Sequence, residues 1–512
     1  MKNKRFKIVI VGGGSAGWMT ATTLLKAKPN CQISLIQSAN IPTVGVGEST
    51  VEPMFNWCKY IGIEEKDFLK HTDGTPKLSI KFTDFYKFGS EAFHYPFGVA
   101  DLKDNFYSIN DWWYKKLLYP KTPNSDYADC IFPEQMAYVN SNKYSSHLPH
   151  AYQFDAIKFG GWLKENKCQK VNHIIDDIKT VEQDENGIVS LNGKYKADLY
   201  IDCTGFRSLL LGKTLKEPFE SYEDMLPNNS AWATRVPYIN KATQVVTYTN
   251  CTAIQNGWVW RVPLWSRLGT GYVYSDKFVS DEDALKEFKS HLKNKEKVPN
   301  VEKLEYRNIK SRVGIHKRLW VKNVVAIGLS AGFIEPLEGN GLYTVHEFLI
   351  NLVRNLRRNT FSQWDRDNFT YMCKENFATF AEFVALHYAL SHRSETKYWK
   401  ANFNKQWDEK LINLNPRFAG VMRHLAENRS VDYTFGPEGG SHCIAAGMNW
   451  SPTDLDVIKY RNPTIPYDDL KSPWLSAITR LNEKKEDAIK SVEKELTMYQ
   501  WLKKNIYKGV NK

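Results

Sequence analysis

A carboxylate placed among glycines is the first feature of this sequence with chemical meaning. The stretch GFIEPLEGNGLY, residues 332–343, puts Glu338 after a proline turn and beside Gly339 and Gly341. A carboxylate that is partly shielded and aimed by its turn can act as a general base. An acidic residue just before a helix can also do no more than favour the helix start. Backbone N–H groups of Asn340 and Gly341, at the expected helix start, would form a nest for an anion.

A glycine pattern near the beginning of the chain predicts a dinucleotide site. Gly12, Gly14 and Gly17 form G-x-G-x-x-G between the apolar run 7–11 and a stretch with helical spacing. In this strand–turn–helix setting the pattern favours pyrophosphate binding over a plain structural turn. The acidic residue expected after the second strand is replaced by Gln37, which can still hydrogen-bond a ribose. NAD is therefore disfavoured, and FAD is left open.

The chain shows no second glycine fingerprint, so nothing indicates a dedicated NAD(P)H site. If the cofactor is a flavin that must be reduced, the reducing equivalents come from elsewhere. We therefore expect a separate reductase that supplies reduced flavin.

The elements that must position these groups indicate an α/β fold. The apolar runs within 194–206 and 323–333 each end in a glycine turn, as strands of an open sheet with ligand at their carboxyl ends would. Residues 215–275 alternate and are rich in aromatic side chains, which predicts antiparallel strands over the ligand face. Beyond residue 343 the spacing is helical, and LNEKKEDAIKSVEKELTMYQWLKK near the end predicts an exposed charged helix.

The expected architecture is a three-layer FAD/NAD(P)-binding module with a covering β-sheet and a mainly helical second subdomain. Residues 1–345 are expected to form the FAD-binding module with interwoven substrate-covering strands. Residues 346–512 are expected to form the mainly helical substrate-side subdomain and the C-terminal helix. A chain of 512 residues is long enough for such a two-part globule.

Charge and cysteine usage exclude several classes of function. The net charge of +12 comes from basic residues scattered among acids, which favours a solvated basic surface over a nucleic-acid site. The eight cysteines are widely spaced without a C-x-x-C pair, so free thiols and no metal site are expected. Glycines interrupt the first apolar run, and no apolar stretch approaches 18 residues. We expect a soluble, cytoplasmic protein that does not bind membranes.

Seven stretches together resemble the flavin-dependent halogenases, in the tryptophan-halogenase branch. They occur in family order over roughly the first 345 residues: the fingerprint at 12–17, VGVGEST at 44–50, GTPKLSIKF at 74–82, YQFDA at 152–156, IDCTGFRS at 201–208, GWVWRVP at 257–263 and GLSAGFIEPLEGNG at 328–341. GWVWRVP resembles the family signature W-x-W-x-I-P, with Val262 in place of Ile.

The resemblance implies a reaction and two catalytic residues. Enzymes of this family use reduced FAD and dioxygen to make a flavin hydroperoxide, which a halide attacks to give hypohalous acid. The acid then travels through a tunnel to a lysine beside the aromatic substrate. By motif position that lysine is Lys77, and Glu338 is the second catalytic residue, which polarises the electrophile or takes the ring proton. Without the motif, a lone lysine would be read as a surface side chain.

The resemblance also implies binding residues and partners. The halide would lie on Asn340 and Gly341, and the flavin would be held by Gly12, Gly14, Ser15, Ala16, Gly17, Ser49, Leu329 and Leu342. Halide and dioxygen are the implied co-substrates, and a small aromatic molecule and a flavin reductase are the implied partners. A homo-oligomer is compatible with this picture.

Two departures from the family pattern bear on specificity. The usual P-L-E-S-T-G has Gly339 and Asn340 here, which should loosen the halide site and favour bromide or iodide over chloride. Tyr95 stands where the family's His-Pro-Phe has histidine, whereas Phe97 keeps its place and can stack on an aromatic ring. Trp450 is a further candidate for the pocket wall. The substrate stays open between tryptophan and another electron-rich indole or phenol.

Two other functions compete with halogenation. A flavin-dependent aromatic hydroxylase usually has Asp after the glycine of the late strand, where this chain has Leu329, and it lacks the GWVWRVP signature. A non-catalytic flavin-binding scaffold would have no need of Lys77 and Glu338 together.

Overall fold

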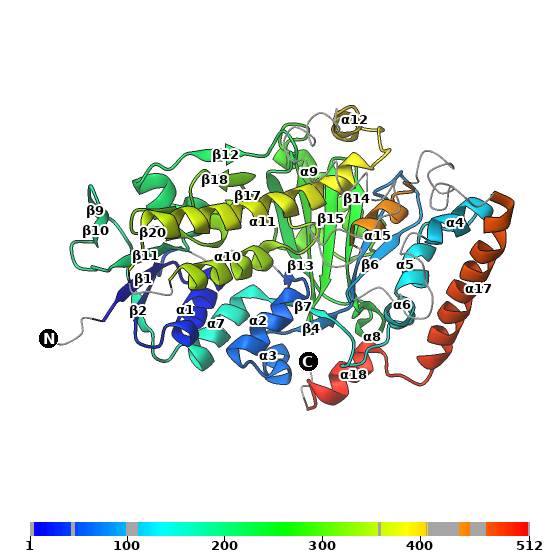
Figure 1. Ribbon diagram of the computed structural model, residues 1–512, viewed down its shortest axis with the longest axis horizontal. Coiled ribbons are helices and arrows are strands. Elements are labelled where there is room, and N and C mark those ends of the chain that lie inside the picture. Colours follow the sequence, from blue (N-terminus) through cyan, green and yellow to red (C-terminus); the bar gives the residue numbers. More distant parts are fainter. Residues whose placement is uncertain are drawn as a thin grey trace.

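In the described part of the chain, five sheets and a set of long helices make up the fold (Figure 1). The computed structural model describes residues 5–41, 47–98, 111–356, 360–405, 407, 440–450 and 467–509. The larger of two hydrophobic clusters in the described residues runs through both large sheets, so the parts of the chain are interwoven.

The first large sheet has six strands in the order β19-β20-β11-β1-β2-β8. Its neighbours are parallel except for the β19–β20 pair. The central strands are continuous apolar runs because both of their faces are buried. The bounds are β1 Lys7–Val11, β2 Gln32–Gln37, β8 Asn172–Ile175, β11 Leu199–Asp202, β19 Trp320–Val321 and β20 Val324–Ala326. The predicted strand–helix–strand start and both distant strands are therefore confirmed.

Three helices pack together beside this sheet: α1 (Ser15–Ala27), α7 (Ala156–Lys167) and α10 (Gly341–Asn355). α1 starts directly after the glycine turn, and α10 starts directly after the Glu338 turn. The two predicted ligand-binding turns are thus brought side by side at the carboxyl ends of the strands (Figure 1).

The second large sheet has seven strands in the order β17-β13-β16-β15-β14-β5-β6. It is antiparallel except between β14 and β5. The bounds are β5 Ser79–Thr83, β6 Phe93–Pro96, β13 Ser230–Val236, β14 Tyr248–Ile254, β15 Gly257–Pro263, β16 Leu268–Tyr274 and β17 Arg307–Lys310. The covering antiparallel strands predicted from the aromatic alternation are confirmed.

Three smaller sheets complete the strand set. One places β7 (Ala151–Asp155) between β3 (Gly47–Ser49) and β4 (Thr75–Lys77), and this sheet positions the predicted lysine. The others are the hairpin of β9 (Val181–Asp184) and β10 (Gly187–Leu191), and the group β12 (Phe219–Ser221), β18 (Gly314–His316) and β21 (Gly332–Phe333).

Helices dominate the chain after β21, as predicted. α11 (Gln363–Ala389) packs on α10 and extends from β19 of the first sheet to α15 beside the second (Figure 1). The remaining helices lie around the second sheet or at the rims: α2 Pro53–Ile61, α3 Glu65–His71, α4 Asp111–Leu118, α5 Asp126–Ile131, α6 Pro133–Asn140, α8 Lys241–Gln244, α9 Asp281–Asn294, α12 Lys397–Phe403, α15 Gly440–Gly447, α17 Tyr467–Ser491 and α18 Met498–Asn505. The short helical turns are η1 Gly205–Arg207, η2 Leu209–Thr214, η3 Val301–Lys303 and η4 Gly328–Ser330.

The predicted single exposed helix at the C-terminus is wrong. The structure has two helices there, α17 and α18, and Thr497 and Gln500 form a capping box that starts the second. α17 packs along α4, α5 and α6, and buries Leu481 completely (Figure 1). Apolar residues on one side of the helix bury against these neighbours, and most of its described charged side chains are exposed, whereas Lys485 pairs with Asp126 of α5.

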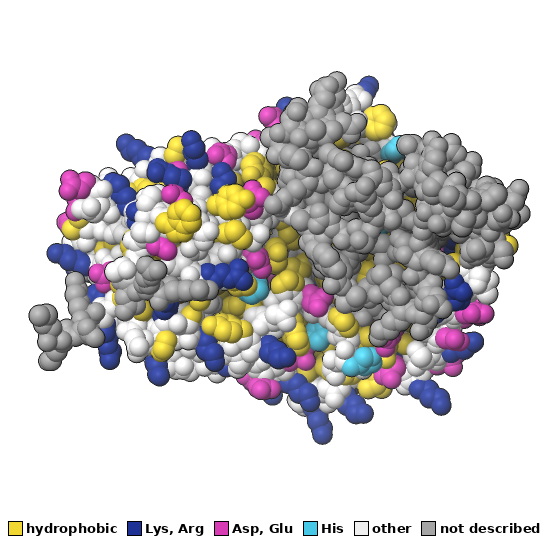
Figure 2. Space-filling model, viewed as in Figure 1, with side chains coloured by type: hydrophobic (Ala, Val, Ile, Leu, Met, Phe, Trp, Pro, Cys, Tyr) yellow, Lys and Arg dark blue, Asp and Glu magenta, His cyan; other side chains and the backbone are white. Residues whose placement is uncertain are grey.

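The division at residues 345/346 falls within α10 and stays a prediction. All eight cysteines are free. Basic side chains are spread among acidic ones over the face shown in Figure 2. Across the described ranges, no helix is both long enough and apolar enough to cross a membrane.

Candidate functional site

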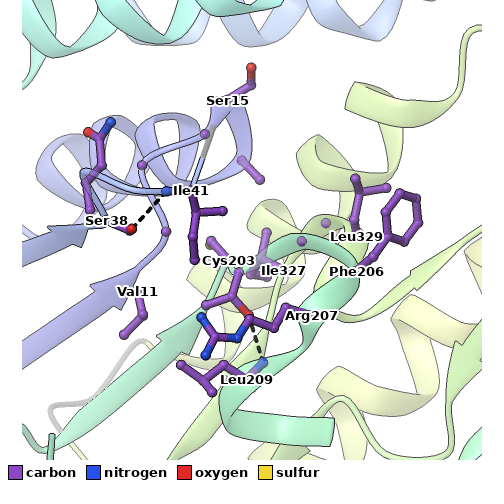
Figure 3. Close-up of a pocket in the computed structure, with 18 of the residues that line it drawn as sticks. Val11, Ser15, Ser38, Ile41, Cys203, Phe206, Arg207, Leu209, Ile327 and Leu329 are labelled. Carbon is purple, nitrogen blue, oxygen red and sulfur yellow. Dashed lines mark hydrogen bonds between the residues drawn. The ribbon is translucent and has the colours of Figure 1, made fainter. Parts of the chain in front are cut away.

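A pocket of about 390 Å³ opens at the carboxyl ends of β1, β2, β11 and β20. Its wall combines the glycine turn with the turn after β11, the short turn Gly328–Ser330 and the start of α10. Figure 3 shows Val11, Cys203, Arg207 and Leu329 around the cavity. The predicted residues Gly12, Gly14, Ser15, Ala16, Leu329, Gly341 and Leu342 all line it. The predicted cofactor residues from distant segments are therefore brought to one cavity.

Two glycines of the fingerprint cannot carry a side chain. Gly12 has φ +121°, and a Cβ there would lie 2.1 Å from the carbonyl oxygen of Cys203. A Cβ on Gly17 would lie 1.9 Å from the carbonyl oxygen of Gly12. Both contacts are far inside van der Waals distance, so the turn and its packing on the sheet depend on glycine.

The far end of this pocket carries acidic residues that the sequence reading missed. Gln37 lines the wall as predicted, and Asp176 and Asp177, just after β8, line it as well. Asp176 accepts hydrogen bonds from Tyr195 Oη at 2.7 Å and Asn192 Nδ2 at 3.3 Å. The acidic group absent after β2 is thus supplied by the neighbouring strand β8, which a search confined to β2 does not find.

A second pocket of about 160 Å³ lies between the seven-stranded sheet and the turn before α10. Its wall is mainly apolar and includes Trp258 and Trp260 of the GWVWRVP strand. Four residues line both pockets: Glu48, Phe206, Leu329 and Gly341. The two cavities are therefore neighbours that share one wall at the start of α10.

Glu48 is a further buried carboxyl group at this shared wall. Burial, with the nearby Asp155 as a second cause, raises the pKa of Glu48 to about 7. Its Oε2 lies 3.9 Å from where a Cβ on Gly341 would be. It belongs to the VGVGEST stretch, but its position beside both pockets was not predicted.

Lys77 is fully buried at the end of β4. Its Nζ donates to Ser49 Oγ at 2.7 Å and to the carbonyl oxygen of Thr50 at 2.8 Å, and it lies 5.0 Å from the Phe97 ring centroid. Burial lowers the pKa of Lys77 to about 7, and the negative charge of Glu338 opposes this shift. The side chain can therefore exchange between ammonium and amine near neutral pH.

Glu338 is also fully buried and lies in the electrostatic environment of Lys77. The turn that holds it depends on Gly339, which has φ +68° and whose added Cβ would lie 2.8 Å from the Ser49 carbonyl oxygen. Its Oε1 lies 2.8 Å from Nε2 of His387 on α11. Within the described part of the chain, its Oε2 has no hydrogen-bond partner.

The start of α10 has the geometry of an anion nest. Asn340 is the residue that precedes the helix, its side chain makes no capping hydrogen bond, and it is almost completely buried. Gly341 is the first helical residue, and its position lies on the wall of both pockets. The first N–H groups of a helix have no intrahelical acceptor, so this end can receive an anion.

The aromatic residues predicted for the substrate wall divide into two groups. Tyr95 and Phe97 are buried, with ring centroids 6.1 Å apart, and Tyr95 also packs on Phe383. Trp450 instead packs on Trp113, which donates a hydrogen bond to its carbonyl oxygen. Among the described residues, no ring contact or hydrogen bond joins Trp450 to Lys77 or Glu338.

His94, displaced by one residue from the family position, points elsewhere. Its Nδ1 lies 2.9 Å from Ser79 Oγ, and its ring packs on Tyr248. Successive side chains of a strand face opposite sides, so a shift of one residue places Tyr95, and not His94, on the face of β6 that packs on Phe97 and Phe383.

Glu335 holds the GWVWRVP strand in a way that was not predicted. Its Oε2 accepts hydrogen bonds from Trp258 Nε1, Asn228 Nδ2 and Tyr388 Oη at 2.7, 2.7 and 2.8 Å. Burial raises the pKa of Glu335, and these three donors oppose that shift. The turn containing Glu338 is thereby tied to the wall of the second pocket.

Comparison with known proteins decides the family. A family model described as tryptophan halogenase matches residues 7–458. The chain belongs to the tryptophan halogenase family. Two relatives are tryptophan 6-halogenase ThaL of Streptomyces albogriseolus, 30% identical over 92% of this chain and 94% of that protein, and tryptophan 7-halogenase RebH of Lentzea aerocolonigenes, 34% identical over 78% and 79%.

Solved halogenase structures share the fold over nearly the whole chain. The tryptophan 6-halogenase SttH of Streptomyces toxytricini superposes with a TM-score of 0.83 at 29% identity, covering 97% of this chain and 99% of that one. The apo structure of VirX1 superposes with a TM-score of 0.87 at 33% identity, covering 98% and 100%. The resemblance stated from the motifs is confirmed, and this tryptophan halogenase family member is a flavin-dependent halogenase.

Membership of the family indicates the general reaction. Flavin-dependent halogenases halogenate an aromatic substrate with a flavin, a halide and dioxygen, and the flavin is reduced by a separate reductase.

Proposed function

We propose that this protein halogenates an electron-rich indole or phenol at a site formed by Lys77 and Glu338. The observation that supports this most is the burial of an amine and a carboxylate in one electrostatic environment, with the amine bonded to the wall of a cavity. Burying an amine and a carboxylate lowers the stability of the folded protein, and buried ionisable groups are concentrated at functional sites.

The two pockets fit FAD. The glycine turn and α1 suit the pyrophosphate, Gln37 with Asp176 suits the ribose end, and the apolar second pocket suits the ring system. When bound in its reduced form, the flavin supplies the oxidising equivalents, from dioxygen, that convert halide to hypohalous acid. Gly339 and Gly341 let the α10 turn approach a ring closely.

Lys77 would receive the electrophile. Its ammonium can hydrogen-bond hypohalous acid, and its amine can be N-halogenated; a pKa of about 7 gives access to both forms. Its bonds to Ser49 and Thr50 fix the nitrogen, and the Phe97 ring lies beside it. The benefit is positioning, because a small diffusible oxidant is held against one face of the substrate ring.

Glu338 would accept the proton that leaves the ring. The carbon–halogen bond forms first, and the carbon–hydrogen bond then breaks with its electron pair returning to the ring. Oε2 has no partner among the described residues and is the oxygen that can take this proton.

The halide site and the substrate wall set specificity in this proposal. Gly339 and Asn340, where the family usually has Ser and Thr, favour bromide or iodide. Tyr95 and Phe97 favour a flat aromatic substrate that stacks on rings. ThaL and RebH are tryptophan halogenases by name, and tryptophan is accordingly one member of the substrate panel.

The test is mass spectrometry of an indole and phenol panel that includes tryptophan. Each reaction contains FAD, a flavin reductase, NADH, air and equal chloride, bromide and iodide. Halogen mass shifts that disappear in Lys77→Ala and fall strongly in Glu338→Gln support the proposal. Shifts of one oxygen atom would establish the hydroxylase instead. Unchanged reactivity in both variants would overturn the assigned roles, and binding of reduced FAD without any product would favour the scaffold.

A further inference from the structure

A buried histidine on α11 faces the carboxylate that the proposed function uses as its base. His387 Nε2 lies 2.8 Å from Glu338 Oε1, and both side chains are 0% exposed. The oxygen lies off the N–H direction, so the contact is an ion pair by distance rather than a straight hydrogen bond. A small rotation of either side chain would align it.

The contacts of the second ring nitrogen of His387, Nδ1, show that this nitrogen carries a proton. His387 Nδ1 lies 3.1 Å from the carbonyl oxygen of Phe383 and 3.2 Å from that of Val384. Carbonyl oxygens accept hydrogen bonds, so Nδ1 carries a proton. A neutral ring would then present a lone pair to the Glu338 carboxylate at 2.8 Å. That arrangement is repulsive, so the pair must share at least one proton between Nε2 and Oε1.

Among the described titratable groups that face Glu338 besides His387, Lys77 is the one that can carry a positive charge. Lys77, Tyr95, Cys251 and Cys443 all face the charge of Glu338 from β4, β6, β14 and α15. Burial raises the pKa of the phenol and of both thiols, which are therefore neutral at physiological pH. Lys77 has a pKa of about 7 and loses its charge as pH rises through that value.

The rings around His387 hold it in place. Phe82, Phe85 and Phe383 pack on the imidazole, with centroid distances of 4.7, 6.3 and 5.8 Å. Glu335 is a second carboxylate that interacts electrostatically with His387, but its Oε2 already accepts three hydrogen bonds. The imidazole is therefore directed at Glu338.

We propose that His387 is the positioning residue of Glu338: it holds Oε1, directs Oε2 at the substrate ring and retains the shared proton when Oε2 takes the ring proton. The inference rests on the proposed function. It assigns the histidine a role in proton removal that goes beyond packing.

The proton balance closes within the site when hypohalous acid is hydrogen-bonded by the Lys77 ammonium. The carbon–halogen bond forms as the halogen–oxygen bond breaks, and the oxygen takes a proton from Lys77 and leaves as water. The ring proton moves to Oε2 while the shared proton stays on Nε2. Lys77 becomes neutral and the His387–Glu338 pair gains one positive charge, so the net charge of the site does not change.

A second histidine–glutamate pair offers a matched control. His150 is buried, its Nε2 lies 2.6 Å from Glu65 Oε1, and its Nδ1 lies 2.7 Å from the Leu148 carbonyl oxygen. Glu65 is on α3 and is 26% exposed. The same residue types and the same backbone contact therefore occur in a pair that opens to solvent.

The experiment compares His387→Gln, His387→Phe and His150→Gln with the wild-type enzyme, supplied with reduced FAD and an accepted substrate. For His387→Gln we expect kcat to fall by about 10-fold, with KM for the aromatic substrate and FAD affinity changed less than about 3-fold. His387→Phe should fall further, because glutamine can still donate to Oε1 and phenylalanine cannot.

A ring-deuterated substrate gives the readout that a packing defect would not change. The isotope effect on kcat for deuterium at the halogenated carbon should be near 1 in wild-type enzyme and rise above about 2 in His387→Gln, because proton removal becomes limiting. In a Glu338→Gln background, His387→Gln should change kcat less than about 2-fold.

Each outcome decides between separate claims. Equal kcat and equal isotope effect in His387→Gln and His150→Gln would overturn the positioning role and leave the halogenase intact. Absence of halogenated product from the wild-type enzyme would overturn the proposed function and this inference with it. If His387→Gln fails to bind FAD, His387→Asn carries the same comparison.

Discussion

Lys77 Nζ donates a 2.7 Å hydrogen bond to the hydroxyl of Ser49, and this contact joins the buried lysine to the wall of the second pocket. Ser49 Oγ also lies 2.8 Å from Thr249 Oγ1, which donates to Gln153 Oε1 at 3.0 Å. Strands β3 and β4, which carry Ser49 and Lys77, both pair with β7. The lysine is therefore held by a hydrogen-bonded chain across four strands, β4, β3, β14 and β7, rather than by its own flexible stem.

Removing the Lys77 amine should separate oxidant formation from halogen transfer. We expect Lys77→Met to lower aromatic halogenation by about 10²–10⁴-fold while reduced flavin is still consumed, because the amine positions the oxidant rather than makes it. Product and released hypohalous acid are both measured. Lys81→Met is the matched control, since Lys81 lies over Tyr248 and is partly exposed. Equal losses in the two variants would contradict this role.

The buried lysine should also leave a signature in stability. Its pKa falls from 10.5 to about 7 on folding, so between these values the unfolded chain binds the extra proton and the stability of the fold rises with pH. From pH 7 to 8.5 the free energy of unfolding of the apo protein should rise by about 2 kcal/mol relative to Lys77→Met, taking roughly 1.4 kcal/mol per pH unit. Urea unfolding at several pH values measures it.

The control for that measurement is Lys158→Met, at an exposed position on α7. The free energy of unfolding of this variant should change with pH in the same way as that of the wild-type protein. Parallel curves for wild type and Lys77→Met would mean that the lysine keeps an ordinary pKa in the fold, and the account of its two protonation forms would be lost.

The glycine fingerprint makes a prediction with an unusually clean control. Gly17→Ala should abolish measurable FAD binding, because its Cβ would lie 1.9 Å from the Gly12 carbonyl oxygen and must displace the turn. Gly161→Ala on α7 should bind FAD normally, since nothing lies within 4 Å of its added Cβ. Fluorescence titration with FAD checks both. Tight FAD binding by Gly17→Ala would show that the cofactor does not depend on this turn.

The sequence could predict those site residues that belong to contiguous motifs, and it could not predict those that only the folded chain brings together. The glycine turn, Lys77 and Glu338 belong to contiguous motifs. The structure places the glycine turn on the first pocket and buries Lys77 and Glu338 next to Ser49 and Gly339, which line the second. His387 has no motif, because a lone histidine among apolar residues of a helix reads as core. Only the folded arrangement of α11 beside the α10 turn shows that it faces Glu338.

Two further features were not predicted: the acidic residues after β8 and the break between α17 and α18. Asp176 and Asp177 follow β8, a four-residue strand with little apolar pattern, so their arrival at the wall of the first pocket depends on tertiary pairing with β2. The break between α17 and α18 was readable, because Thr497 and Gln500 have capping-box spacing. The helical charge pattern on both sides of that box concealed it.

Halide choice should respond to Asn340 without disturbing the turn. Gly339 is unsuitable for this test, since its φ of +68° and the 2.8 Å approach of an added Cβ to the Ser49 carbonyl oxygen would strain any other residue. Asn340 has helical backbone angles and accepts threonine sterically at the backbone. We expect wild-type enzyme to prefer bromide or iodide when the three halides compete, and Asn340→Thr to move the product ratio toward chloride by about 3- to 10-fold, because the added hydroxyl donor favours chloride, the halide of the three that accepts hydrogen bonds most strongly. Product ratios from one reaction vessel measure this directly and cancel differences in total activity. A clear chloride preference in the wild-type enzyme, or a ratio that does not move in the variant, would show that the residue preceding α10 does not set halide size.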